Sequence, residues 1–155
     1  MRGKPAPKRT IKPDEKFNRE DVAKFINYIM ERGKKTVAKG IVYDALDYIS
    51  EKTKADAVEI FDSAIKNIAP SVEIKGKRVG GANYQVPIAV RPERSFALAC
   101  RWLIDATKAK KGKKMSIKLA EEIMAAHNNE GAAIKKKQDT YRMAEANRAF
   151  AHFAR

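Results

Sequence analysis

The sequence contains very little cysteine and no long apolar run. Cys100 is the single cysteine among 155 residues, so an internal disulfide is excluded, as is typical of a protein in a reducing, intracellular compartment. No apolar run approaches the roughly 20 residues of a membrane-spanning helix. The basic start of the chain is not followed by the apolar stretch of a signal peptide. We therefore expect a cytoplasmic protein with no membrane partner.

Acidic residues are scarce relative to basic ones. Lys and Arg number 33 against 19 Asp and Glu, which gives a net charge of +14. So large a charge repels itself in the folded state, and binding to a polyanion relieves that repulsion. Nucleic acid, an anionic membrane and an acidic protein all fit this description. Because the basic residues are clustered and partly arginine, nucleic acid is favoured over a merely solubilising surface.

Patterns typical of catalysis or metal binding are also missing. Cys100 lies on an apolar helical stripe, which indicates core packing rather than a nucleophile. His127 and His152 are isolated and lack the ligand spacing of a zinc site. Gly80 and Gly81 do not lead into the Gly-Lys-Ser/Thr of a phosphate-binding loop. We expect no enzyme activity, no cofactor and no metal.

Helical periodicity runs through most of the chain and predicts six helices. Asn18, Asp56 and Ser116 are candidate N-caps, and Pro92 suits the first turn of another helix. The second helix is expected to open at Lys34 and Lys35, and the last to run from about Ala132 to Phe153. The same periodicity predicts which residues face the core. Among them are Val37 on the second helix, His127 on the fifth and Met143 on the last.

The periodicity breaks between Ser71 and Val90, where two strands flank a basic, glycine-rich tip. If the apolar residues of both strands share one face, Val72 pairs with Val90 and Ile74 pairs with Ile88. A three-residue loop at 80–82 then turns the chain. Pro87 donates no backbone hydrogen bond, so a wider sheet is disfavoured.

The predicted fold is therefore mainly α, a single-domain bundle of six helices with a protruding two-stranded β-ribbon between the third and fourth helices. A basic, extended arm at residues 1–17 precedes the helical domain at 18–155, which the charge pattern indicates to bind nucleic acid, and the ribbon occupies about 72–90. A ribbon that projects from a helical body and carries cations near its tip is suited to reach a negatively charged partner.

Four basic clusters are candidates for that contact: the arm, the pair Lys34 and Lys35, the ribbon and a lysine-rich loop at 108–114. At the opening of a helix, two lysines and the free N–H groups together form a phosphate site, although a solvated loop explains them equally well. Tyr84 on the ribbon either stacks on a base, or contacts Arg78, or packs in the core.

Three separated segments resemble one known family, bacterial ribosomal protein seven of the small subunit. Asn27–Leu46 is similar to its signature, Arg78–Pro87 to its arm and Thr140–Phe153 to its last helix. The resemblance covers essentially the whole chain, and three motifs in the same order are highly specific. The short N-terminal arm resembles that of bacterial and organellar members.

This resemblance implies a structural constituent of the small ribosomal subunit. It implies a primary rRNA-binding protein that organises the 3′ major (head) domain of 16S rRNA, near the exit-site tRNA and the mRNA exit path. The implied partners are small-subunit ribosomal RNA, exit-site tRNA, mRNA, and ribosomal protein eleven of the small subunit with other head proteins. Outside the ribosome we expect a monomer.

The resemblance also assigns residues. The positions expected to face rRNA are Arg2, Lys4, Lys8, Arg9, Lys12, Lys34, Lys35, Lys75, Lys77, Arg78, Arg91, Arg94, Lys110, Lys111, Lys113, Lys114 and Lys118. The positions expected near tRNA and mRNA, on the arm and the last helix, are Gly80, Gly81, Ala82, Asn83, Tyr84, Arg142 and Arg148.

Two other functions compete with this interpretation. A β-ribbon inserted in the minor groove would make the protein an architectural DNA binder, although its basic clusters are spread over several elements. An RNA-directed enzyme would need Cys100 or His127 as its reactive group.

Overall fold

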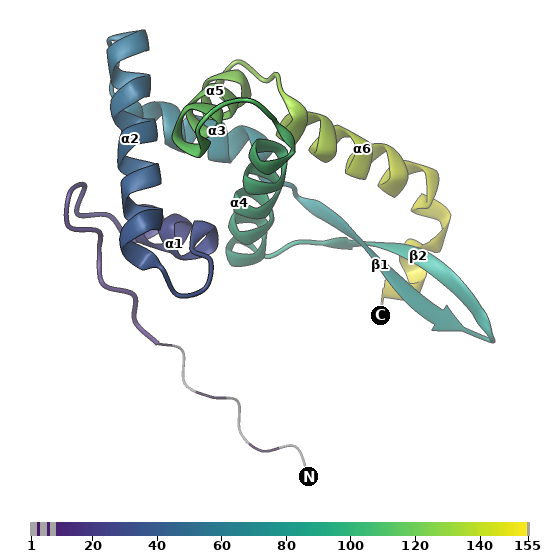
Figure 1. The fold of residues 1–155 in the computed structure, drawn as a ribbon. Helices are drawn as coiled ribbons and strands as arrows, with labels where there is room; N and C mark the ends of the chain where they lie inside the picture. The colour runs from purple at the N-terminus through teal and green to yellow at the C-terminus, as the bar shows by residue number, and fades with distance from the viewer. Residues whose placement is uncertain (1–2, 4–5, 7–8, 155) are drawn as a thin grey trace. The chain divides into compact units, whose positions relative to one another are not determined.

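The computed structural model describes residues 3, 6 and 9–154. It divides into two compact units, Met1–Gly40 and Ile41–Arg155. The described part of the chain forms six α-helices, one antiparallel two-stranded ribbon between α3 and α4, and a final 3-10 helix, η1 (Figure 1). The predicted mainly α fold with a ribbon after the third helix is confirmed. No helix in this part combines the length and the apolar character needed to cross a bilayer.

The first unit contains α1, Glu20–Ile29, which buries Val22, Phe25 and Ile26 on one face. The predicted cap at Asn18 is wrong, because Asn18 adopts a positive φ of 51° and Arg19 holds the N-cap position. The turn before α1 is organised by Asp14, which is 4% exposed. Its carboxylate accepts hydrogen bonds from the backbone N–H groups of the two residues Lys16 and Phe17.

Helix α2, Lys35–Thr53, begins where the sequence predicted. Gly33 precedes it with a φ of +74°, in the left-handed region that glycine adopts without strain. Val37 is 56% exposed, so its predicted place on the inner face is wrong. The buried face is one residue further on, and it comprises Ala38, Val42, Ala45, Leu46 and Ile49.

The second unit is built around α5, Met115–His127, which contacts both α3, Ala57–Ile68, and α4, Pro92–Ala109. Asp56 caps α3 by accepting a hydrogen bond from the Val58 N–H at 2.9 Å, and Pro92 occupies the first turn of α4, both as predicted. Ser116 is not the cap of α5, because the extended backbone that a cap requires lies at Lys114. His127 is exposed rather than on an inner face.

The last helix is shorter than predicted. Helix α6, Ala132–Ala146, ends at Asn147, whose backbone and side-chain N–H groups both donate to the Met143 carbonyl. The chain continues as η1, Arg148–Ala154. Met143 is 42% exposed and not part of the core, because α6 buries a different face that includes Ala133, Ile134, Thr140 and Ala144.

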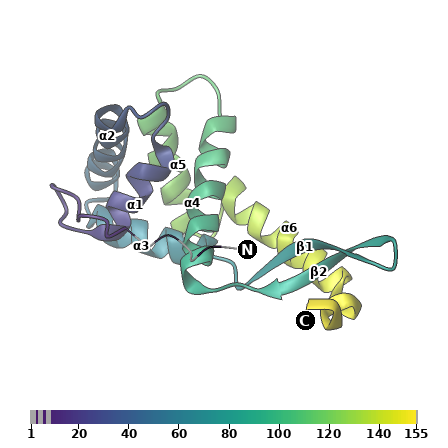
Figure 2. The same cartoon turned by 90° about the horizontal axis from the view of Figure 1, so that it is seen from below.

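The ribbon consists of β1, Val72–Val79, and β2, Ala82–Ala89, and it projects away from α3, α4 and α5 (Figures 1 and 2). The predicted register is wrong by one residue, since Val72 pairs with Ala89 and Ile74 with Pro87. The turn has two central residues, Gly80 and Gly81, with φ values of 57° and 90°. Positive φ at both positions is the type I′ geometry, which matches the natural twist of a hairpin. The turn, not the apolar pattern, therefore sets the register.

Candidate nucleic-acid interface

The corrected register gives the ribbon two different faces. One face carries the paired residues Lys75 and Val86, then Lys77 and Tyr84. The opposite face carries Gly76 opposite Gln85, then Arg78 opposite Asn83. The three basic residues of the ribbon therefore do not lie on one side, because Arg78 lies on the face opposite to both lysines.

The face that carries Tyr84 is covered by the C-terminal 3-10 helix, which Figure 2 shows beside the ribbon. The Tyr84 ring lies 5.0 Å from that of Phe150 and 5.2 Å from that of Phe153. Lys77 donates a hydrogen bond from Nζ to the Phe153 carbonyl at 2.7 Å. Of the roles left open for Tyr84, the structure shows packing within the protein. We call this contact between η1 and the ribbon the aromatic clasp.

The other face of the ribbon is open. Arg78, Asn83 and Gln85 are exposed, and none of them makes a hydrogen bond or ion pair with another described residue. Between them lies Gly76, where an added Cβ would meet no atom within 4 Å. Guanidinium and amide groups around a bare stretch of backbone are suited to phosphate and base edges.

The base of the ribbon is braced by Glu73, whose side chain is 13% exposed. Lys75 Nζ lies 3.2 Å from one carboxylate oxygen, and Arg94 Nη2 lies 3.2 Å from the other. Desolvation raises the pKa of Glu73, but the hydrogen bonds and charges of Lys75 and Arg94 outweigh it, so the pKa lies below its ordinary value. Arg91, at the N-cap of α4, is exposed.

Helix α6 is fastened to the same base. The Tyr141 hydroxyl lies 2.9 Å from both the backbone nitrogen and Oγ of Ser71. Lys137 donates from Nζ to the Asn67 carbonyl at 2.7 Å. On the outer side of α6 and η1, Arg142 pairs with Asp139 and Arg148 pairs with Glu145. Both arginines expected near tRNA and mRNA therefore have carboxylate partners within the protein.

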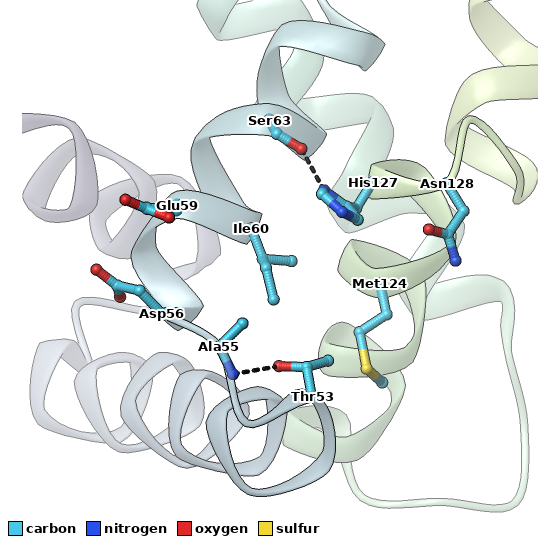
Figure 3. Close-up of a pocket in the computed structure, with 9 residues that line it drawn as sticks. All are labelled: Thr53, Ala55, Asp56, Glu59, Ile60, Ser63, Met124, His127 and Asn128. Atoms are coloured by element: carbon cyan, nitrogen blue, oxygen red, sulfur yellow. Dashed lines mark hydrogen bonds between the residues drawn. The ribbon is translucent and has the colours of Figure 1, made fainter.

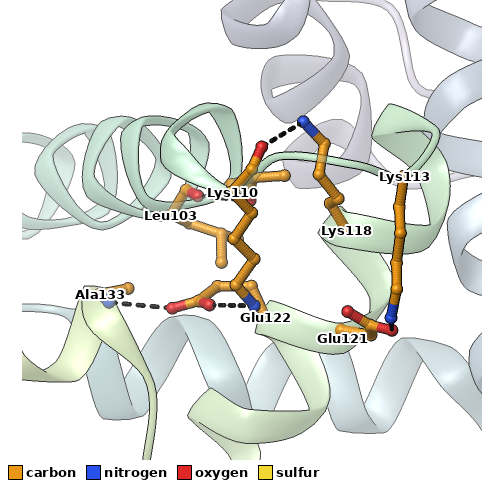
Figure 4. Close-up of polar contacts among 8 residues, drawn as sticks. Leu103, Lys110, Lys113, Lys118, Glu121, Glu122 and Ala133 are labelled. Atoms are coloured by element: carbon orange, nitrogen blue, oxygen red, sulfur yellow. Dashed lines mark hydrogen bonds and ion pairs between the residues drawn. The ribbon is translucent and has the colours of Figure 1, made fainter.

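The lysine loop, the lysine-rich segment at 108–114, is folded back on α4 and α5, and Lys118 of α5 takes part in its contacts (Figure 4). Lys118 donates to the Lys110 carbonyl at 2.7 Å. Lys113 pairs with Glu121, and that hydrogen bond lowers the pKa of the carboxyl group despite some desolvation. Lys111 and Lys114 are exposed, and their side chains form no ion pair or hydrogen bond within the part of the chain that the structure describes. Only these two lysines of the predicted loop set are unengaged.

Glu122 holds the inner end of this loop. Its side chain is 1% exposed, and Lys110 Nζ lies 2.6 Å from Oε2, close enough for an ion pair although not in hydrogen-bond geometry. The other oxygen accepts a hydrogen bond from the Ala133 N–H at 2.9 Å, in the first turn of α6 (Figure 4). One buried carboxylate therefore joins the end of α4 to the start of α6. Gly131 lies beside it, where a Cβ would approach Oε1 to 2.8 Å.

In the first unit, the remaining predicted cations are exposed. Lys34 and Lys35 lie at the opening of α2, and their ammonium groups have no partner among the described residues. Arg9 and Lys12 are exposed in a segment without regular secondary structure. Arg2, Lys4 and Lys8 lie outside the described residues. That these groups bind phosphate stays a prediction.

Glu73 and Glu122, which we call the acidic anchors because each holds basic side chains in place, were not predicted from the sequence. Glu73 interrupts an apolar strand pattern, and this was its only signal. In the sequence, Glu122 has the pattern of an ordinary surface acid of a helix, and Gly131, which lies beside it in the structure, is nine residues further along the chain. Within the described residues, no group of three or more His, Cys, Asp and Glu side chains is placed to hold a metal ion. Cys100 is buried.

Comparisons with known proteins show the family of the chain. The family model described as "Ribosomal protein S7p/S5e" matches residues 1–148. A protein of Thermotoga maritima named "Small ribosomal subunit protein uS7" is 58% identical over 153 residues, 99% of each chain. The protein of the same name from Desulfatibacillum aliphaticivorans is 54% identical over 152 residues, 98% of this chain and 97% of its own. The chain therefore belongs to the ribosomal protein S7p/S5e family.

Proposed function

We propose that the protein is a primary rRNA-binding protein that organises the 3′ major (head) domain of 16S rRNA, near the exit-site tRNA and the mRNA exit path. The general function follows from its family: it is a structural protein of the small subunit of the cytoplasmic ribosome, with 16S rRNA as partner, and it is not an enzyme. Family membership also decides against the architectural DNA binder. The head domain and the exit site are implied by the resemblance.

The two-faced ribbon is the observation that best supports the finer proposal. The aromatic clasp holds the ribbon through Tyr84 and Lys77, so η1 supports the ribbon in a fixed position. The open face then offers Arg78, Asn83 and Gln85 to a partner. Folded RNA is recognised largely through phosphates, 2′-hydroxyls and shape, to which such groups on a rigid arm are suited.

The basic residues of the proposed interface fall into two classes. Those whose charged side chains are exposed and have no partner among the described residues are ready to meet phosphate, and they are Arg9, Lys12, Lys34, Lys35, Arg78, Arg91, Lys111 and Lys114. Those with a partner inside the protein would have to exchange or share it on binding, and they are Lys75, Lys77, Arg94, Lys110, Lys113 and Lys118. We propose that the first class contributes most of the salt-dependent affinity.

Contacts of Gly80, Gly81, Ala82 and Asn83 with tRNA and mRNA are part of the same proposal, and so is ribosomal protein eleven of the small subunit as a neighbouring partner. The glycine turn is the outermost part of the ribbon and lets a nucleic-acid backbone approach closely. A monomeric state outside the ribosome is likewise proposed, since a net charge of +14 disfavours self-association.

Salt titration with a transcript of the 3′ major domain of 16S rRNA tests the proposal. Replacing Lys75, Lys77 and Arg78 together by Ala should flatten the dependence of log K on log salt by about one unit for each lost phosphate contact. Arg78→Ala alone should change the slope more than the matched Lys77→Ala, whose ammonium already has an acceptor. Unchanged slopes, or preference for duplex DNA in competition, would contradict it.

A further inference from the structure

A hollow of about 530 Å³ lies between the start of α3 and the end of α5 (Figure 3). Ile60 and Met124 project into it from the two helices. Ser63 and His127, joined by a hydrogen bond, lie at one end, and Thr53 lies at the other. No residue of the proposed RNA interface lines it. We call this site the acidic hollow, after the two carboxylates at its α3 edge, Asp56 and Glu59.

The acidic hollow lies in the acidic part of a basic chain. Residues 41–63 contain only two cations, Lys52 and Lys54. Lys52 is engaged over the ring of Tyr48, with Nζ 5.1 Å from the ring centroid. The acids of the same segment are Asp44, Asp47, Glu51, Asp56, Glu59 and Asp62. Phosphate groups are repelled from such a surface, whereas Lys and Arg side chains are attracted to it.

We propose that the acidic hollow docks a cationic segment of another protein of the small subunit, with one apolar side chain between Ile60 and Met124 and its basic side chains at Asp56 and Glu59. The partner is cationic for a physical reason. Proteins assembled on rRNA need Lys and Arg to neutralise phosphates, as this chain does, so their segments carry the charge that this surface attracts. The inference is independent of which RNA the protein binds.

The two kinds of lining group have separate roles in this docking. The apolar side chains of Ile60 and Met124 supply a contact that excludes water, which is the main source of affinity. The exposed carboxylates add little affinity, but they select a cationic segment and fix its direction along α3. Asn128, at the α5 side, adds an amide that can bond the backbone of an extended segment.

The experiment uses the full chain, labelled with nitrogen-15, and a short synthetic peptide of alternating lysine and glycine with a central phenylalanine. We expect saturable binding, with amide shifts concentrated at Ile60, Met124 and His127. A peptide with alanine in place of the phenylalanine should bind more weakly. Fluorescence anisotropy gives the affinity. Because the whole chain is strongly positive, a cationic peptide has no general attraction to it.

The test variant is Asp56→Asn with Glu59→Gln. Asparagine still caps a helix, so α3 should keep its N-terminal hydrogen bond. We expect peptide affinity to fall roughly fivefold, since exposed ion pairs are individually weak, and rRNA affinity to be unchanged or slightly higher. The matched control, Asp105→Asn with Glu145→Gln, removes the same charge at exposed sites on α4 and α6 and should bind the peptide as the wild type does.

Several outcomes would overturn the inference. Peptide binding that does not saturate, or an equal loss in the control variant, would mean that no specific site exists. Shifts of the same amides by an rRNA transcript would make RNA the occupant. Concentration-dependent dimerisation that the test variant abolishes would make it a second copy of the chain. If the test variant fails to fold, the peptide titration of the wild type tests the inference alone, and amide shifts away from the acidic hollow would overturn it.

Discussion

The lysine loop and the β-ribbon carry similar charge, but they are attached to the body by different contacts. In the loop, Lys110 reaches the Glu122 carboxylate, which is 1% exposed, so the acidic partner of this ion pair belongs to the core. In the ribbon, Lys75 and Arg94 share the partly exposed Glu73, and Lys77 donates to a backbone carbonyl. One basic segment of a molecule can therefore be fixed in place by an ion pair with a buried carboxylate, while another keeps cations whose partners are exposed enough to be exchanged.

This difference has an energetic reason. A buried carboxylate without partners is strongly unfavourable, so Glu122, Lys110 and Ala133 form a set that must remain together while the protein is folded. An ion pair near the surface contributes little, because water solvates the separated groups almost as well. The ribbon cations are therefore freer to change partners than Lys110 is.

The largest expected effect is that of Glu122→Ala. It leaves the Ala133 N–H and the Lys110 ammonium without their acceptor, and we expect the free energy of unfolding to fall by about 2–4 kcal/mol. Urea denaturation monitored by circular dichroism measures it. The matched variant Glu121→Ala removes the neighbouring, more exposed partner of Lys113 and should cost less than about 1 kcal/mol. Equal losses would remove the distinction between the two regions.

Gly131→Ala should have the next largest effect, again through Glu122. Gly131 has a φ of +94°, and an added Cβ would lie 2.8 Å from Glu122 Oε1. Gly112→Ala is the control, since its φ is +86° but the space around it is open. Backbone strain should cost about 1–2 kcal/mol in both. A further loss in Gly131→Ala alone, measured in the same urea experiment, reports the displacement of the carboxylate.

The double variant Phe150→Ala with Phe153→Ala tests whether the aromatic clasp stabilises the ribbon. Removing both rings uncovers Tyr84, and we expect the free energy of local opening of the ribbon to fall by about 1 kcal/mol. Amide hydrogen exchange of β1 and β2 measures it. The exposed Met143→Ala serves as the control. Unaltered exchange in the double variant would show that the aromatic clasp does not hold the ribbon.

The smallest expected effect is the pH dependence at Glu73. Its pKa in the folded protein lies below the ordinary value of 4.5, so its pairs with Lys75 and Arg94 stabilise the folded state above about pH 4.5. That contribution is lost as the pH falls through the folded-state pKa. Thermal unfolding of the wild type and Glu73→Gln should differ at pH 6, and the difference should shrink steadily as the pH is lowered below 4.5. A constant difference would mean that the pairs contribute nothing.

The sequence predicted the elements of the fold better than their details. Asp56 and Pro92 act through the backbone next to them, so local chemistry was enough to place the starts of α3 and α4. The register of the ribbon depended on the turn at Gly80 and Gly81, and the assumption of one shared apolar face gave the wrong pairing. The family resemblance placed the basic clusters, but no local pattern reveals which cations are engaged.

The acidic anchors were beyond sequence reasoning for a related reason. Glu122 contacts Lys110 and Ala133, which come from other helices, so its role exists only after the helices have packed. The same holds for Tyr84, whose partners lie far along the chain in η1. Residues whose function is set by distant segments cannot be recognised from periodicity or caps.

The contacts where the ribbon joins α3 and α4 have a consequence for how long the ribbon can be. Ser95 Oγ donates to the Pro70 carbonyl at 2.7 Å, and the Val90 N–H donates to the Ser71 carbonyl at 2.9 Å. Hydrogen bonds therefore hold together the two segments that connect the ribbon to α3 and α4, just before the paired strands begin. Closing a longer or shorter hairpin on these connected segments changes the chain entropy only slightly. Paired residues can therefore be removed from or added to the outer end in equal numbers, which changes the reach of the arm and leaves the helices as they are.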